Sequence, residues 1–186
     1  LADTTGIVTT SGAVSVLANS TGNASFNSIQ YFGGGATTVG ATSSGDASMT
    51  MLATQINQVQ SAGTLTIEST GSGNARFSAP NALSVRVTDA GQNLLVQTTN
   101  SGQASFSAPA ATVSVASGTL TVNSASSTSS TGVAGFTAGG LVLTGATTVQ
   151  SGLAPAGIEV LGNLVSLGNL TVTAGANTAD FSANNA

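Results

Sequence analysis

The residues of this chain that could carry acid–base chemistry are few and scattered. General acid–base catalysis needs titratable groups held close together, and enzymes that cleave polysaccharides use paired carboxylates for it. The 186-residue sequence has six acidic residues, two arginines and no histidine. The acidic residues are Asp3, Asp46, Glu68, Asp89, Glu159 and Asp180. Asp46 and Asp180 hold comparable places beside a repeated motif, but several repeats separate them. We therefore expect solvated single charges and no catalytic residues.

The sequence also predicts no metal or cofactor site. Histidine and cysteine, the usual ligands of zinc, are absent, and so is the Gly- and Asp-rich nonapeptide that binds calcium in some β-helices. The glycine run 33–35 is followed by no lysine, which argues against a phosphate-binding loop and favours a tight corner. With a net charge of −4, the chain is a poor partner for nucleic acids. Its apolar runs are too short for membrane insertion as a helix.

A short motif, [ST]-G-x-A-x-F, recurs along the chain. Its clearest copies are 72–77 and 101–106, with looser copies at 21–26 and 131–136. Met49 replaces Phe in a further copy, Phe181 ends a copy that lacks the glycine, and 151–156 is a degenerate copy. Successive copies lie about 20 to 30 residues apart, a spacing typical of solenoids and other repeat proteins.

Two further patterns keep step with this motif. One is G-x-[apolar or Thr]-x-[Val or Ile], as at 63–67 and 118–122; in the first four units it starts 14 residues before the end of the motif. The other follows most copies of the motif, as at 85–87, 113–115 and 158–160. All three alternate apolar and polar residues, with Gly, Asn, Ser and Pro between them. Each repeat therefore reads as three short strands.

These patterns predict an all-β fold. We expect one domain over residues 1–186, folded as a parallel β-solenoid (β-helix) of about seven three-strand coils. Equivalent side chains would then stack about 4.8 Å apart, so that the last residues of the motif form an internal core ladder. The predicted ladder consists of Phe26, Met49, Phe77, Phe106, Phe136 and Phe181. An antiparallel β-sandwich would also alternate in this way, but nothing in that fold requires a motif to return in register.

Two segments, 90–97 and 167–175, resemble the β-helix repeats of filamentous-haemagglutinin-type exoproteins. The resemblance covers most of the chain. It implies a right-handed β-helix, export to the cell surface, and an adhesive or structural role.

We expect a structural protein that is not an enzyme. A solenoid has two open ends whose unpaired strand groups can template another chain. The low charge leaves little repulsion between copies, so the expected partner is the chain itself, in an end-to-end homopolymer that forms a filament or surface layer. The candidate polymerisation ends are Leu1, Ala2, Asp3, Asn184, Asn185 and Ala186. The chain starts with neither Met nor a leader, so we expect a secreted and processed protein, extracellular or at the cell surface.

Two alternatives stay open at this point. The chain could be a segment of a large adhesin that binds surface glycans or host surfaces, with Tyr31 and Phe32 either packed inside or exposed as a docking patch. A less favoured alternative is an ice-binding solenoid, because outward threonines would form a ladder interrupted by Leu95 and Glu68. The expected members of that ladder are Thr64, Thr66, Thr119, Thr121, Thr148, Thr171 and Thr173.

Overall fold

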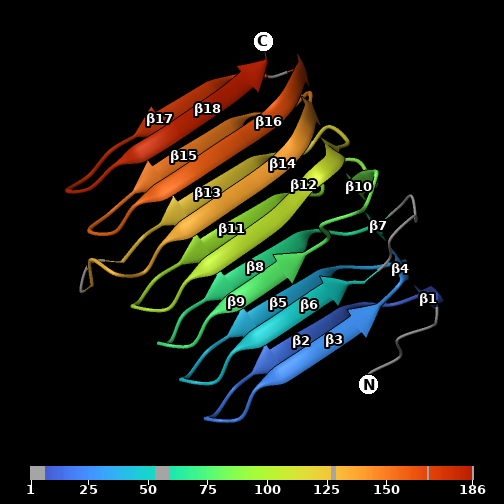
Figure 1. Ribbon diagram of the computed structural model, residues 1–186, viewed down its shortest axis with the longest axis horizontal. Coiled ribbons are helices and arrows are strands. Elements are labelled where there is room, and N and C mark those ends of the chain that lie inside the picture. The colour runs from blue at the N-terminus through green and yellow to red at the C-terminus, as the bar shows by residue number, and fades with distance from the viewer. Residues whose placement is uncertain (1–6, 53–58, 127–128, 167, 186) are drawn as a thin grey trace.

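The chain folds into a stack of β-coils. The computed structural model describes residues 7–52, 59–126, 129–166 and 168–185, and every regular element within these residues is a β-strand. The strands pair in parallel and build a β-solenoid of about six turns. Figure 1 shows the coils rising in chain order from the N-terminal strand to the C-terminal strand. The prediction of an all-β parallel solenoid is confirmed, with a number of turns close to the expected seven.

Each coil contributes strands to three faces, which we name the Phe face, the closing face and the Thr face. The Phe face carries the repeated motif, on β3 (Ala24–Ser28), β6 (Ala47–Met51), β9 (Ala75–Ser78), the first parts of β12 (Ala104–Val115), β14 (Ala134–Leu143) and β16 (Ala156–Ser166), and β18 (Ala179–Asn185). The closing face follows in the chain, on β1 (Ile7–Thr10), β4 (Gln30–Gly33), β7 (Val59–Ser61), β10 (Ser84–Val87) and the second parts of β12, β14 and β16. The Thr face completes the coil, on β2 (Val14–Ala18), β5 (Thr37–Ala41), β8 (Leu65–Ser69), β11 (Leu94–Thr98), β13 (Leu120–Ser124), β15 (Thr147–Ser151) and β17 (Leu170–Thr173).

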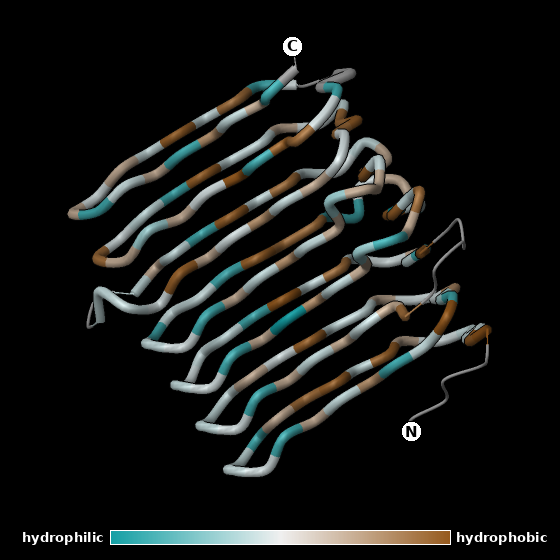
Figure 2. Tube along the Cα trace, in the orientation of Figure 1, coloured by the Kyte–Doolittle hydropathy of each residue, from teal (hydrophilic) through white to brown (hydrophobic). Residues whose placement is uncertain are grey.

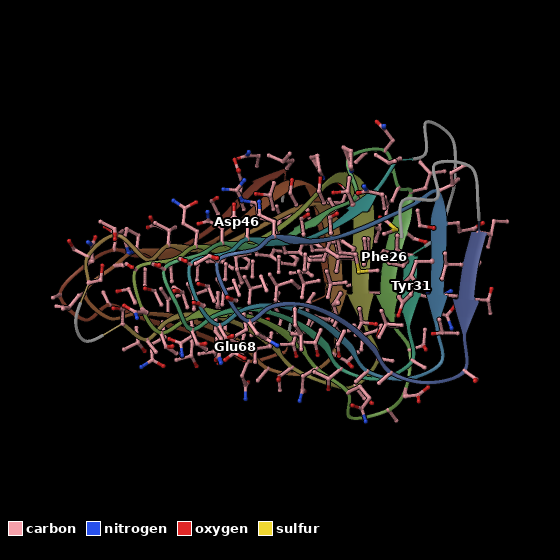
Figure 3. All side chains as sticks on the ribbon, turned by 90° about the horizontal axis from the view of Figure 1, so that it is seen from below. Phe26, Tyr31, Asp46 and Glu68 are labelled. Atoms are coloured by element: carbon pink, nitrogen blue, oxygen red, sulfur yellow. The ribbon has the colours of Figure 1, made fainter. Side chains whose placement is uncertain are left out.

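The Phe face and the Thr face lie against each other as two layers, and the closing face runs between them at one end (Figure 3). At the opposite end, short turns join β2, β5, β8, β11, β15 and β17 of the Thr face to the next Phe-face strand (Figure 1). Small side chains flank these turns because the two layers meet there. Ser69 and Ala75, on either side of one such turn, are both 0% exposed. The alanine of the repeated motif is thus explained by the space available beside the turn.

The core consists of inward-facing rows of like residues from successive coils. On the Thr face, Val39 pairs with Ile67 and Ile67 with Val96, and all three are fully buried. The residues between them face outward, and the alternation of hydrophobic and hydrophilic positions along the strands is visible in Figure 2. Burial of each such side chain contributes about 1.5–3 kcal/mol before the cost of ordering the chain. Since the sequence has no cysteine, no disulfide adds to this burial.

The strand register corrects the sixth copy of the motif. Ala156 pairs with Ala134, and Ile158 pairs with Phe136 and Phe181. Segment 158–160 therefore lies on the Phe face, whereas the sequence suggested that it was the third strand of its repeat and that the motif ended at Ala156. A shift of two residues leaves the inward and outward alternation unchanged, so the hydrophobic pattern alone does not reveal it.

Candidate functional site

The acidic residues of the described chain lie on the outside of the coils in different settings. Glu68 faces outward on the Thr face and accepts a hydrogen bond from the Nε2 of Gln97, whereas Asp46 lies on the opposite side of the coil (Figure 3). Asp46 Oδ1 accepts hydrogen bonds from the backbone nitrogen of Asn74 at 2.8 Å and from its Nδ2 at 3.1 Å. Asp46 thereby ties two neighbouring coils together at the turn. This is a structural role that the motif pattern did not reveal.

Asp46 and Asp180 are not equivalent in the stack. Asp46 directly precedes the alanine of its motif, whereas Asp180 follows the alanine and pairs with Gly157. Glu159 lies two residues beyond Gly157 on the same outward side, so Glu159 and Asp180 are diagonal neighbours on adjacent strands. The sequence did not indicate this neighbourhood, because its pattern placed Glu159 on a different strand. No group of three or more potential metal-ligating residues occurs within the described ranges, and Asp3 lies outside them.

The predicted core ladder is assembled as one continuous row on the inner side of the Phe face. Met49 pairs with both Phe26 and Phe77, Phe106 follows, and Phe136 is next. Ile158 completes the row between Phe136 and Phe181. The rings of Phe77 and Phe106 stack with centroids 4.9 Å apart, and those of Phe106 and Phe136 with centroids 4.7 Å apart. Such pairs contribute about 0.5–1.5 kcal/mol beyond the area that they bury.

Tyr31 belongs to the core and not to a surface patch. It is 1% exposed, and its ring meets Phe26 edge to face at 5.9 Å (Figure 3). Its hydroxyl shares a 2.8 Å hydrogen bond with Thr37 Oγ1, which in turn lies 2.9 Å from Ser61 Oγ. The alternative of an exposed Tyr31–Phe32 docking patch is therefore wrong for Tyr31, because the hydroxyl finds buried partners. Phe32 is half-buried.

The glycine of the repeated motif has a structural cause in the turn between the Thr face and the Phe face. Buried hydroxyls at the end of Thr-face strands donate to the glycine carbonyl oxygens: Thr98 to Gly102 at 2.7 Å, and Ser124 to Gly132 at 2.8 Å. A Cβ at Gly102 would lie less than 3.0 Å from the carbonyl oxygen of Gly73 in the coil beneath. At this position glycine therefore lets the turn approach the coil beneath so closely.

The outward threonines form a row that differs in part from the predicted one. Thr38 pairs with Thr66, Thr121 with Thr148, and Thr148 with Thr171, while Leu95 interrupts the row between Thr66 and Thr121. The other predicted members lie elsewhere. Thr64 and Thr119 precede their strands and hydrogen-bond with Gln92 and Asn93, and Thr173 belongs to the adjacent outward row with Glu68.

The two ends of the stack expose side chains that are core residues elsewhere. At the N-terminal end, Val14, Ala24 and Phe26 border a hollow of about 470 Å³ between β2 and β3. Figure 3, seen from below, looks onto this end. At the other end, Leu170 is 43% exposed and Val172 is 44% exposed. Their counterparts in the middle coils are fully buried, so each end presents a cut cross-section of the core.

Only part of the predicted polymerisation ends falls within the described chain. Leu1, Ala2, Asp3 and Ala186 lie outside the described residues, Asn184 is exposed, and Asn185 ends β18. The end surfaces are instead formed by inward-facing residues of β2, β3, β17 and β18. The sequence could have indicated them, since they are the first and last members of the predicted rows.

Comparisons with protein-family models, with curated proteins and with solved structures gave no match. The fold itself identifies the chain as a β-helix repeat protein. Within the described residues, no helix is long and apolar enough to cross a membrane.

Proposed function

We propose that this chain is a non-enzymatic structural protein, located outside the cell or on its surface, that assembles end to end into a filament or surface layer. The observation that carries this proposal is the open core at both ends of the stack. A parallel solenoid ends in strands with unpaired backbone N–H and C=O groups, and such edges template the addition of further strands. Because the two ends are different surfaces, their contact does not close on itself and continues into a polymer.

The apolar side chains at the ends supply part of the driving force. Val14, Phe26, Leu170, Val172 and Phe181 are inward residues that are only partly covered. Burying the exposed part of each contributes up to about 1 kcal/mol per residue. Each new backbone hydrogen bond adds about 0.5–1.5 kcal/mol. These gains work against an association cost of about 4–15 kcal/mol, so assembly is expected to depend steeply on concentration.

The expected location agrees with the resemblance to filamentous-haemagglutinin-type exoproteins. The outer surface carries few charges and many hydroxyl-bearing side chains, which suits a scaffold that is inert toward ions and nucleic acids.

A concentration series tests the proposal. Purified protein is examined by sedimentation velocity and by negative-stain electron microscopy, from dilute to concentrated solution. We expect unbranched filaments whose subunit repeat is roughly 34 Å, because the Thr face has seven strands and neighbouring strands lie about 4.8 Å apart. A chain that sediments as a monomer at every concentration, with isolated short rods on the grid, would contradict end-to-end assembly.

A groove on the closing face favours a second candidate function, that of an adhesin segment which binds surface glycans. The groove has a volume of about 230 Å³ and is lined in part by Arg86, Thr88, Ser114 and Thr144. Hydroxyls and a guanidinium group are suited to hydrogen bonding with sugar hydroxyls and carboxylates. A glycan array probed with the wild-type chain and with Arg86→Ala tests this function. Binding that the substitution does not weaken would argue against the groove as the site.

A further inference from the structure

A row of glycines lies beside the turns between the Thr face and the Phe face, and it indicates what can pack beneath the N-terminal end. Added Cβ atoms at Gly45, Gly73 and Gly102 would each lie less than 3.0 Å from a carbonyl oxygen of the coil beneath, on its N-terminal side. These glycines are therefore required by the coil under them. Gly22 is the lowest glycine of the row, and a Cβ there would meet nothing within 4 Å.

A second row, at the start of the Thr-face strands, repeats the pattern. Added Cβ atoms at Gly35, Gly145 and Gly168 would lie less than 3.0 Å from the backbone of Gly12, Gly118 and Gly145, respectively. Gly12 is the lowest member, and it too has nothing within 4 Å. Within the described chain no coil lies under Gly12 or Gly22, yet both positions carry the glycine that most higher members of their rows carry. The exceptions are Gln92 in one row and Ala154 and Asn177 in the other.

A coil that fits beneath the N-terminal end would present the same backbone that the coils under Gly35 and Gly45 present. The chemistry that fits there is therefore that of another solenoid end.

The C-terminal end of a second copy matches this requirement. Its last Phe-face strand, β18, carries Ala179 and Phe181 in the places that Ala24 and Phe26 hold in β3. Its last Thr-face strand, β17, carries Val172 in the place that Val16 holds in β2. The rows of both faces would thus continue across the junction.

The charges allow this contact. Residues 7–45 contain no charged side chain, so Asp180, the acidic residue of β18, meets no like charge in this described part of the N-terminal end. In the continued register Asp180 faces Ser25, much as Arg76 faces Ser48 within the stack. The order of faces also continues, because β18 lies on the Phe face and β1 begins on the closing face.

We propose that copies of this chain stack head to tail, with β18 of one copy pairing with β3 of the next and β17 pairing with β2, and that Gly12 and Gly22 are the residues that permit this contact. The inference rests on the proposed end-to-end assembly and adds its polarity and register. A head-to-head contact would place two N-terminal ends together with antiparallel strands, and it would leave the glycines at positions 12 and 22 without a cause.

Alanine substitutions at Gly12 and Gly22 test the proposed junction separately from end-to-end assembly itself. Gly12→Ala and Gly22→Ala each add a methyl group that is free in the monomer and clashes with a coil placed beneath it. Gly135→Ala is the matched control, because its Cβ also meets nothing within 4 Å but lies on the outer side in mid-stack. We expect all three variants to match the wild-type denaturation midpoint. Gly12→Ala and Gly22→Ala should raise the concentration needed for filaments at least about tenfold, a loss of about 1.4 kcal/mol per contact, and Gly135→Ala should leave it unchanged.

The outcomes are distinct. Wild-type filaments that form equally well with Gly12→Ala and Gly22→Ala overturn the inferred junction and leave end-to-end assembly standing. A wild-type chain that does not assemble at all contradicts the proposed function itself.

Cysteine crosslinking tests the register directly, because the chain has no cysteine of its own. Ser25→Cys and Asp180→Cys in one chain place the two thiols at opposite ends of the stack, and both positions are exposed. At a head-to-tail junction the two Cα atoms would be adjacent strand partners, within the 4.4–6.8 Å range of disulfides. Mild oxidation should then give a ladder of covalent multimers. The pair Ser25→Cys with Ser182→Cys, which is two residues out of register, should crosslink much less. Dimers from Ser25→Cys alone would indicate head-to-head contact and overturn the proposal.

Discussion

The substitution Gly102→Ala tests whether close stacking of the turns contributes to the stability of the solenoid. The added Cβ would lie less than 3.0 Å from the carbonyl oxygen of Gly73 and from the hydroxyl of Ser69, and 3.0 Å from the carbonyl oxygen of Gly71. Two of the three obstacles are backbone atoms, which cannot rotate away. Overpacking of this kind costs about 1–3 kcal/mol.

The same displacement strains the hydrogen bond from Thr98 Oγ1 to the Gly102 carbonyl oxygen, and loss of a buried bond costs about 1–3 kcal/mol more. Replacing glycine by alanine recovers only about 0.4–1 kcal/mol, because alanine lowers the conformational entropy of the unfolded chain. The overpacking and the lost bond outweigh this gain, so we expect a net loss of about 2–4 kcal/mol in the free energy of unfolding.

Urea denaturation followed by far-UV circular dichroism, at low protein concentration, measures this loss. Gly135→Ala serves as the control, since its methyl group would lie in open space on the outer side of β14. We expect the control to equal or slightly exceed the wild type. If the free energy of unfolding of Gly102→Ala lies within about 0.5 kcal/mol of the wild-type value, close stacking does not hold the turns, and Gly12 and Gly22 are not needed for a coil to stack beneath them.

Four further substitutions probe the core. Phe106→Ala should lower the free energy of unfolding by about 3–5 kcal/mol, because the Phe106 ring stacks on both sides. Phe26→Ala should cost less than half of that, because Phe26 lies at the open N-terminal end. Equal losses for the two variants would contradict an open N-terminal end. Thr98→Val should cost about 1–3 kcal/mol because the Gly102 carbonyl oxygen loses its hydroxyl donor, and a neutral result would mean that water replaces the donor. Tyr31→Phe should cost about 1 kcal/mol in the same denaturation assay, because the Thr37 hydroxyl that loses the tyrosine keeps Ser61 Oγ as a buried partner. A loss above about 3 kcal/mol would indicate a larger hydrogen-bond network.

Much of the fold could be predicted because each repeat carries the same local alternation of apolar and polar residues. The alternation of Leu65 and Ile67 with outward Thr66 and Glu68 indicates a strand with one buried side. Recurrence of that pattern in step with a second motif indicates a coil. The core ladder follows, since residues in equivalent places of a parallel coil must stack.

The sixth repeat shows where the pattern fails. Ile158 replaces phenylalanine and Ala154 replaces glycine, so the motif loses both of its distinctive residues there. Any even shift keeps Ile158 and Val160 inward. Only the backbone pairing with Ala134 and Phe136 fixes the register.

The sequence by itself determined the class of fold, the three-strand repeat and the identity of nearly every inward residue, because these depend on local alternation and on recurrence along the chain. Tertiary structure decided which groups from different coils meet. It placed Tyr31 beside Thr37 in the core, set Glu159 diagonal to Asp180, and left Gly12 and Gly22 with nothing beneath them. These contacts depend on the lengths of the turns and on the pairing between coils. Hydrophobic alternation does not encode either of them, because every coil repeats the same pattern whatever lies above or below it.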